Sequence, residues 1–104
     1  MTVIDKVEHC NTMAEVRQHI DALDERIVAL MAERSGYVAQ AARIKQVATQ
    51  VHDQARIDFI VDRVKRMARE QGAPEAVITA GYRAMIGAFI EFEHGEFQRL
   101  RQEA

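Results

Sequence analysis

The sequence predicts a single all-α domain, residues 1–104, and three observations favour this fold class. Apolar residues recur every three or four positions over long stretches, as they do along one face of a helix. Only one proline and five glycines occur in 104 residues, which leaves little room for the turns of a loop-rich or all-β fold. The length suits one domain, near the size at which a lone chain forms only a thin core.

Composition restricts the partners and the surroundings that we expect. The formal net charge of -2 gives no general attraction to nucleic acid or to anionic membranes. The single cysteine, Cys10, excludes an internal disulfide and suits a reducing compartment. No apolar run approaches the roughly 20 residues that cross a bilayer, and the first dozen residues lack a signal-peptide pattern. We therefore expect a soluble, cytoplasmic protein.

The first predicted helix runs from Met13 to about Val47, after a loose arm of weakly patterned residues 1–10. Thr12 and Glu15 have the spacing of a capping box, which satisfies the free N–H groups of a helix start. Because no proline interrupts it, this helix would be about 33 residues and roughly 50 Å long. One chain of this size cannot cover so long a helix, so we expect a second copy to pack against it.

Two further helices follow. Asp53 is a suitable N-cap for the second helix, and Gly72 is suited to end it in a left-handed conformation. Pro74 then stands where a first-turn proline opens the third helix. The second helix has an apolar inner face, and the third has a similar stripe that one acid interrupts. The two sets are Ile57, Ile60, Val61, Val64, Met67 and Ala68, and Ile78, Tyr82, Met85, Phe89, Glu93, Phe97 and Leu100.

Charged residues within these apolar stripes are the candidates for function. Arg34 replaces an apolar residue in the seam of the first helix, and Lys45 follows 11 positions later. That separation is about 1100° of rotation, which places both on nearly one face about 16 Å apart. Glu93 occupies a core position on the third helix. Since a buried charge is costly unless an opposite charge meets it, we expect the cations to grip a small molecule with two acid groups.

Two other arginines extend this set. Arg56 lies in the first turn of the second helix, whose N-terminus itself favours anions. Arg17 lies 17 positions before Arg34, about 25 Å away and on a different face, so it cannot share that ligand within one chain. In an antiparallel dimer it could reach the partner's pocket. The sequence has no zinc spacing, HExxH motif, phosphate loop or nucleophile elbow, so we expect neither metal nor cofactor.

Structural roles are the alternative for each of these residues. Arg17 and Lys45 could lie on solvated helix faces, and Arg34 could form a structural ion pair with an acid such as Glu93. The four scattered histidines show no partner pattern and suit surface or packing positions; they are His9, His19, His52 and His94.

A joint pattern nevertheless extends over the first two predicted helices. It comprises Arg17, Ile20-Asp21-Ala22-Leu23-Asp24, Ala32-Glu33-Arg34, Lys45 and Arg56. Over about residues 10–100 the chain resembles the all-helical (class II) chorismate mutases. Within them it is most similar to the isochorismate-pyruvate lyase-like subgroup. There a cysteine precedes the first helix and a Tyr-Val-x-x-Ala-x-x-x-Lys run closes it, matched here by Cys10, Tyr37, Val38, Ala41 and Lys45.

The resemblance implies an intertwined homodimeric helical bundle with two sites, each completed by Arg17 of the other subunit. It implies that Arg34 and Arg56 hold the carboxylates of chorismate or isochorismate. Lys45 would donate to the ether oxygen whose bond to carbon breaks. Glu93 stands where bacterial mutases usually have a glutamine that donates to the same oxygen. The reaction is pericyclic, so it needs neither a metal nor a covalent intermediate.

Two positions depart from the typical mutase. Ile57 replaces a glutamate that contacts the ring hydroxyl, and Asp53 is the residue that could recover this contact. Glu93 can donate a hydrogen bond only when protonated, so we predict that turnover falls as pH rises. Fungal members of the family also carry a glutamate there.

The leading prediction is a chorismate mutase, which converts chorismate to prephenate. The first alternative is an isochorismate-pyruvate lyase that yields salicylate and pyruvate, and an amino-chorismate mutase is a weaker third. A different class of function is a non-catalytic helical dimerisation or regulatory module, in which Arg34, Lys45 and Glu93 form structural ion pairs.

Overall fold

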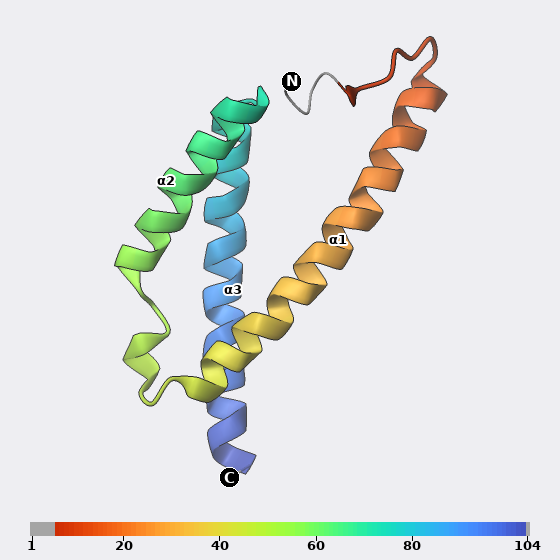
Figure 1. Cartoon of the computed structure of the whole chain (residues 1–104). Coiled ribbons are helices and arrows are strands. Elements are labelled where there is room, and N and C mark those ends of the chain that lie inside the picture. Colours follow the sequence, from red (N-terminus) through yellow and green to blue (C-terminus); the bar gives the residue numbers. More distant parts are fainter. Residues whose placement is uncertain (1–5, 104) are drawn as a thin grey trace.

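The computed structural model describes residues 6–103 as three long helices and one short 3-10 helix (Figure 1). No strand occurs among these residues, so the predicted all-α fold class is confirmed. The elements are α1 (Met13–Ile44), η2 (Ala48–Gln50), α2 (Gln54–Gln71) and α3 (Glu75–Glu103).

The caps predicted for α1 are present, with one difference. The Thr12 hydroxyl accepts from the Glu15 backbone N–H at 3.2 Å, but the Glu15 carboxylate accepts from the N–H of Asn11 at 2.9 Å. The helix ends at Ile44, three residues before the predicted end at Val47. It ends there because the backbone of Lys45 is extended, with φ -62° and ψ 142°.

The boundaries of the other helices follow from local chemistry as predicted. The Asp53 carboxylate accepts from the backbone N–H of Arg56 at 3.0 Å and so caps α2. Gly72 has φ 73°, a left-handed conformation that costs a residue with a Cβ about 1–2 kcal/mol. Pro74 then precedes Glu75, the first residue of α3.

The helix α3 is the centre of the molecule. The helix α3 packs along α2. The C-terminal part of α1 crosses the C-terminal half of α3, and the N-terminal part of α1 diverges from it (Figure 1). The contact of α2 with α3 buries Val61, Val64 and Ala68 of the predicted inner face, whereas Met67 is 36% exposed. Ile86 of α3 is buried as well, one position from the predicted Met85. A second apolar cluster joins the end of α1 to α3 and contains Ala42, Val51 and Phe97.

The N-terminal part of α1 extends away from the other helices (Figure 1). The apolar seam predicted to be buried is therefore open in the single chain, with Ile20, Leu23, Ile27 and Leu30 between 49% and 63% exposed. No other part of residues 6–103 reaches this face, which is the reason for the difference. None of the helices in this range is long and apolar enough to cross a membrane.

Candidate active site

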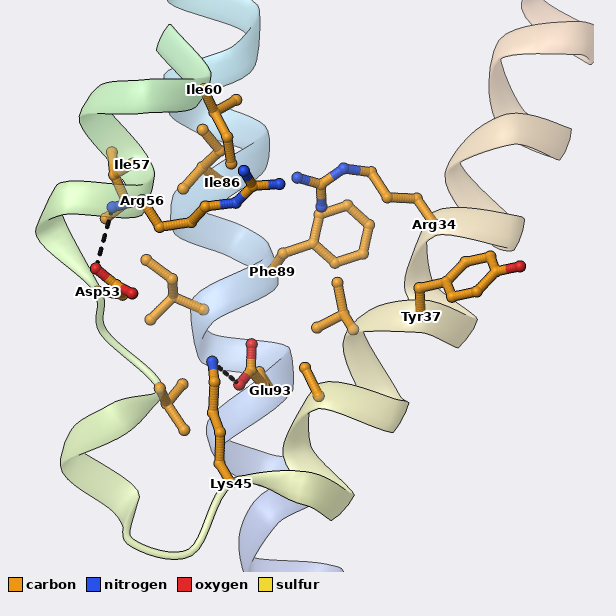
Figure 2. A pocket seen from close by; sticks show the side chains of 14 residues that line it. Arg34, Tyr37, Lys45, Asp53, Arg56, Ile57, Ile60, Ile86, Phe89 and Glu93 are labelled. Carbon is orange, nitrogen blue, oxygen red and sulfur yellow. Dashed lines mark hydrogen bonds and ion pairs between the residues drawn. The ribbon is translucent and has the colours of Figure 1, made fainter.

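A pocket of about 450 Å³ lies where the C-terminal half of α1, the start of α2 and the middle of α3 meet. It brings together five of the six predicted site residues, as Figure 2 shows. These are Arg34, Lys45, Asp53, Arg56 and Glu93. The other wall residues are apolar except for Tyr37, and they comprise Val38, Ala41, Val51, Ile57, Ile60, Ile86, Phe89 and Ile90.

Two guanidinium groups extend toward one another across one end of this pocket. Arg34 comes from α1 and Arg56 from α2, and both side chains point inward (Figure 2). Each rests on an aromatic ring: the Arg34 Cζ is 4.8 Å from the Phe89 centroid, and the Arg56 Cζ is 5.2 Å from that of Phe59. Neither guanidinium forms an ion pair with an acid of residues 6–103, so both retain donors for an anion.

An ion pair occupies the other end of the pocket. The Lys45 ammonium lies 2.6 Å from a carboxylate oxygen of Glu93, and this glutamate is buried, with 7% of its surface exposed (Figure 2). The pair neutralises a carboxylate that would otherwise be costly to bury. The alternative pairing of Glu93 with Arg34 is wrong, because Lys45 takes that position and Arg34 lies over Phe89 instead.

Asp53 and Ile57 form the side of the pocket that belongs to α2. One carboxylate oxygen of Asp53 caps the helix through the N–H of Arg56, and the carboxylate has further acceptor capacity. Ile57 gives this side an apolar surface. The described lining contains no Ser, Thr, Cys or His, and the Tyr37 hydroxyl points away from the pocket (Figure 2). The arrangement is suited to binding an anion and to stabilising negative charge on it.

Comparison with known families agrees with this arrangement. The model of the family described as chorismate mutase type II matches residues 16–94, which include all six predicted site residues. The chain belongs to the chorismate mutase type II family. The family resemblance read from the arginine and lysine motif is therefore confirmed.

A named relative supports the same family. The chain is 33% identical over 66 residues to a protein named chorismate mutase from Methanocaldococcus jannaschii. The match covers 62% of this chain and 67% of the relative. The finer likeness to the isochorismate-pyruvate lyase-like subgroup stays a prediction.

Arg17 is the one predicted site residue of this chorismate mutase family member that lies outside the pocket. It is exposed on the N-terminal part of α1, which diverges from α2 and α3. Because α1 is one continuous helix from Met13 to Ile44, Arg17 and Arg34 are separated by about 25 Å along its axis. Arg17 therefore does not complete the pocket of its own chain.

Sequence reasoning missed three side chains that support the site. Phe59 and Phe89 carry the guanidinium groups of Arg56 and Arg34, and Arg101 donates to the backbone at the end of α1. The helical spacing of Phe59, three positions after Arg56, was a usable signal. The contact between Arg34 and Phe89 joins two helices, so no local spacing predicts it.

Proposed function

We propose that this pocket is the active site of a chorismate mutase, where chorismate rearranges to prephenate. The family and the named relative make the chain an enzyme of this type, an isomerase. One observation carries the assignment of the site: two guanidinium groups without acidic partners in residues 6–103 face the same cavity as a lysine. A small dicarboxylate with a polar reacting atom complements this set.

The two arginines would bind the substrate carboxylates. A guanidinium presents parallel N–H donors that match the two oxygens of a carboxylate, and such charge-assisted bonds are among the strongest in proteins. The ring of Phe89 and the half-exposed ring of Phe59 already lie against Arg34 and Arg56 before the substrate arrives. Fixed donors favour the one compact substrate conformer that can react, which is the main requirement of a pericyclic step.

Lys45 would stabilise the charge that develops during the reaction. As the carbon–oxygen bond of the ether breaks, negative charge grows on that oxygen, and a fixed ammonium lowers the energy of this transition state. The ammonium already points into the cavity, held by Glu93 at 2.6 Å. Binding of substrate would redirect one of its three donors to the ether oxygen.

Glu93 would act in two protonation states. As a carboxylate it accepts from Lys45 and keeps the ammonium in the pocket. As a neutral acid it could donate to the ether oxygen, as a glutamine does in the same place. Asp53 would accept from the ring hydroxyl while its other oxygen continues to cap α2.

A second copy of the chain would complete the site. The exposed apolar face of α1 includes Ile20, Leu23, Ile27 and Leu30, which a monomer would leave in water. Pairing of two such faces would bury them and would bring the Arg17 side chain of each copy toward the pocket of the other. The protein would then be an intertwined homodimer with two shared sites.

Direct assay tests the proposed reaction. The purified protein is incubated with chorismate and, separately, with isochorismate, and the products are separated by chromatography. Prephenate from chorismate is the expected result. Salicylate and pyruvate from isochorismate, without prephenate, would favour the lyase, and the absence of any product would favour a non-catalytic helical module.

A further inference from the structure

Near the end of α3, Arg101 binds the backbone at the end of α1, including that of Lys45, whose ammonium group lies in the pocket. One guanidinium nitrogen of Arg101 donates to the carbonyl oxygen of Ala42 at 2.8 Å, and another donates to the carbonyl oxygen of Lys45. These carbonyls belong to the last turn of α1 and to its C-cap, where α1 itself supplies no N–H group. Arg101 therefore closes the end of α1 from a different helix.

A buried aromatic ring holds Arg101 in this position. The Arg101 Cζ lies 3.7 Å from the centroid of Phe97, which is 8% exposed. Phe97 belongs to the apolar cluster with Ala42 and Val51, so its ring is fixed from several sides. Arg101 itself is exposed to solvent, so the ring acts mainly by limiting where the guanidinium lies.

Lys45 is thereby held at both of its ends by one face of α3. Glu93, Phe97 and Arg101 follow one another at intervals of four residues, which places them on successive turns of the same face. Glu93 pairs with the ammonium at 2.6 Å, and Arg101 binds the backbone from which the side chain starts. Helix ends readily fray, so this second contact reinforces the bond from the Lys45 N–H to the Ala41 carbonyl oxygen in fixing where the lysine side chain begins.

We propose that Arg101 is a positioning residue for catalysis that acts through Lys45, an inference that rests on the proposed mutase activity. When substrate draws the ammonium away from Glu93, the Arg101 contacts and the bond from the Lys45 N–H to the Ala41 carbonyl oxygen still hold the Lys45 backbone in place. A misplacement of about 1 Å at a reacting group can lower a rate by as much as 10²-fold. Arg101 lies beyond the matched segment 16–94, so the family pattern does not assign it this role.

Three variants of the full chain test this role. Arg101→Ala removes both backbone contacts, and Arg101→Lys keeps the charge but loses the fork that reaches two carbonyls. Arg99→Ala is the matched control, since Arg99 lies in the same turns of α3 but, within residues 6–103, pairs only with Glu96 and Glu103. We measure kcat and KM with chorismate, together with the melting temperature and helical circular dichroism.

A specific split of the kinetic constants is expected. In Arg101→Ala, kcat falls by about tenfold or more while KM stays within about twofold, because Arg34 and Arg56 still bind the carboxylates. Arg101→Lys has an intermediate kcat, at least about threefold below that of the wild type, and carries the test if the alanine variant does not fold. Arg99→Ala keeps both constants.

Other results overturn the proposal. An unchanged kcat in either Arg101 variant would do so. A fall in kcat no larger than that of Arg99→Ala, or a rise in KM that accounts for the whole fall in kcat/KM, would also overturn it. In each of these cases an active wild-type protein leaves the proposed function standing. A wild-type protein without mutase activity would overturn both proposals together.

Discussion

At the scale of single residues, the central feature is a pair of arginines that point at one another without acids between them. Structural arginines usually pair with a carboxylate, and the chain does this elsewhere, as Arg69 does with Glu75 at 2.7 Å. Arg34 and Arg56 instead rest on rings and face the pocket. Their donors are therefore arranged for something that the chain does not itself provide within residues 6–103.

Arg34→Ala should separate the catalytic role of this residue from a structural one. We expect kcat/KM for chorismate to fall by about 10²-fold or more, since a charge-assisted contact to the substrate is lost. The melting temperature should stay the same or rise, because removal of Arg34 leaves no buried acid unpaired. Arg34→Lys is the control that keeps the charge, and it should retain part of the activity. A large loss of stability with activity preserved would instead indicate a structural residue.

Glu93→Gln should change the pH profile of turnover. In the proposed mechanism only a neutral carboxyl group could donate to the ether oxygen, so we expect the rate to fall as pH rises. An amide donates at every pH, so the variant should lose this alkaline decline. The measurement is kcat between about pH 5 and 9, which brackets the usual range of catalytic acids and bases. A profile identical to that of the wild type would contradict the donor role of Glu93.

At the scale of helices, most boundaries were predictable because local chemistry sets them. Thr12 and Asp53 cap two helices, and the left-handed Gly72 ends one of them. That Arg34, Lys45 and Glu93 line one pocket was also predictable, since charges in apolar stripes are conspicuous. The partner of Glu93 was not, because it depends on how far along α3 the end of α1 lies, and no spacing within one helix determines that register.

Gly72→Ala should destabilise the turn between α2 and α3. A Cβ at φ 73° costs about 1–2 kcal/mol of unfolding free energy. Gly81→Ala is the matched control, because Gly81 lies inside α3 and an added Cβ would meet nothing within 4 Å. That control should gain roughly 0.5–1 kcal/mol, since alanine is the better helix former. Urea unfolding measures both, and equal effects of the two substitutions would contradict the assignment of the turn.

Surface charges in the last turns of α3 should make a pH-dependent contribution to the stability of the fold. The hydrogen bond from Arg99 lowers the pKa of Glu96 below its ordinary value. An acid whose pKa is lowered by folding stabilises the folded state at pH values above its ordinary pKa. This contribution disappears as the pH falls through the lowered pKa. Arg99→Ala should therefore melt slightly below the wild type at neutral pH and equal to it in acid. A difference that persists in strong acid would exclude this pair as its cause.

At the scale of the whole molecule, α1 determines how complete one chain can be. Its C-terminal half forms one wall of the pocket, whereas its N-terminal half carries an apolar face that the single chain leaves exposed. The periodicity predicted a buried seam, and its N-terminal part is exposed in the single chain. The length of the helix led us to expect a second copy there, and this stays a prediction because periodicity alone carries no information about the partner.

Complementation between two inactive variants should test the shared site. In a dimer of one Arg17→Ala chain and one Arg34→Ala chain, one site has both substitutions and the other has neither. Equal amounts, unfolded and refolded together, should regain about a quarter of the wild-type activity if the chains pair at random. Each variant refolded alone is the control and should stay inactive. No gain on mixing, despite mixed dimers detected by mass spectrometry, would exclude donation of Arg17 between subunits.

The opposed arginines of the pocket also bear on how this protein could be engineered. Like charges directed at one another repel, so Arg34 and Arg56 lower the stability of the resting fold. A screen that rewards heat resistance alone should therefore enrich neutral residues of similar volume, such as methionine, at these two positions. The most heat-resistant variants from such a screen would be poor catalysts. Small dianions such as malonate should raise the melting temperature of the wild type and leave that of these variants unchanged.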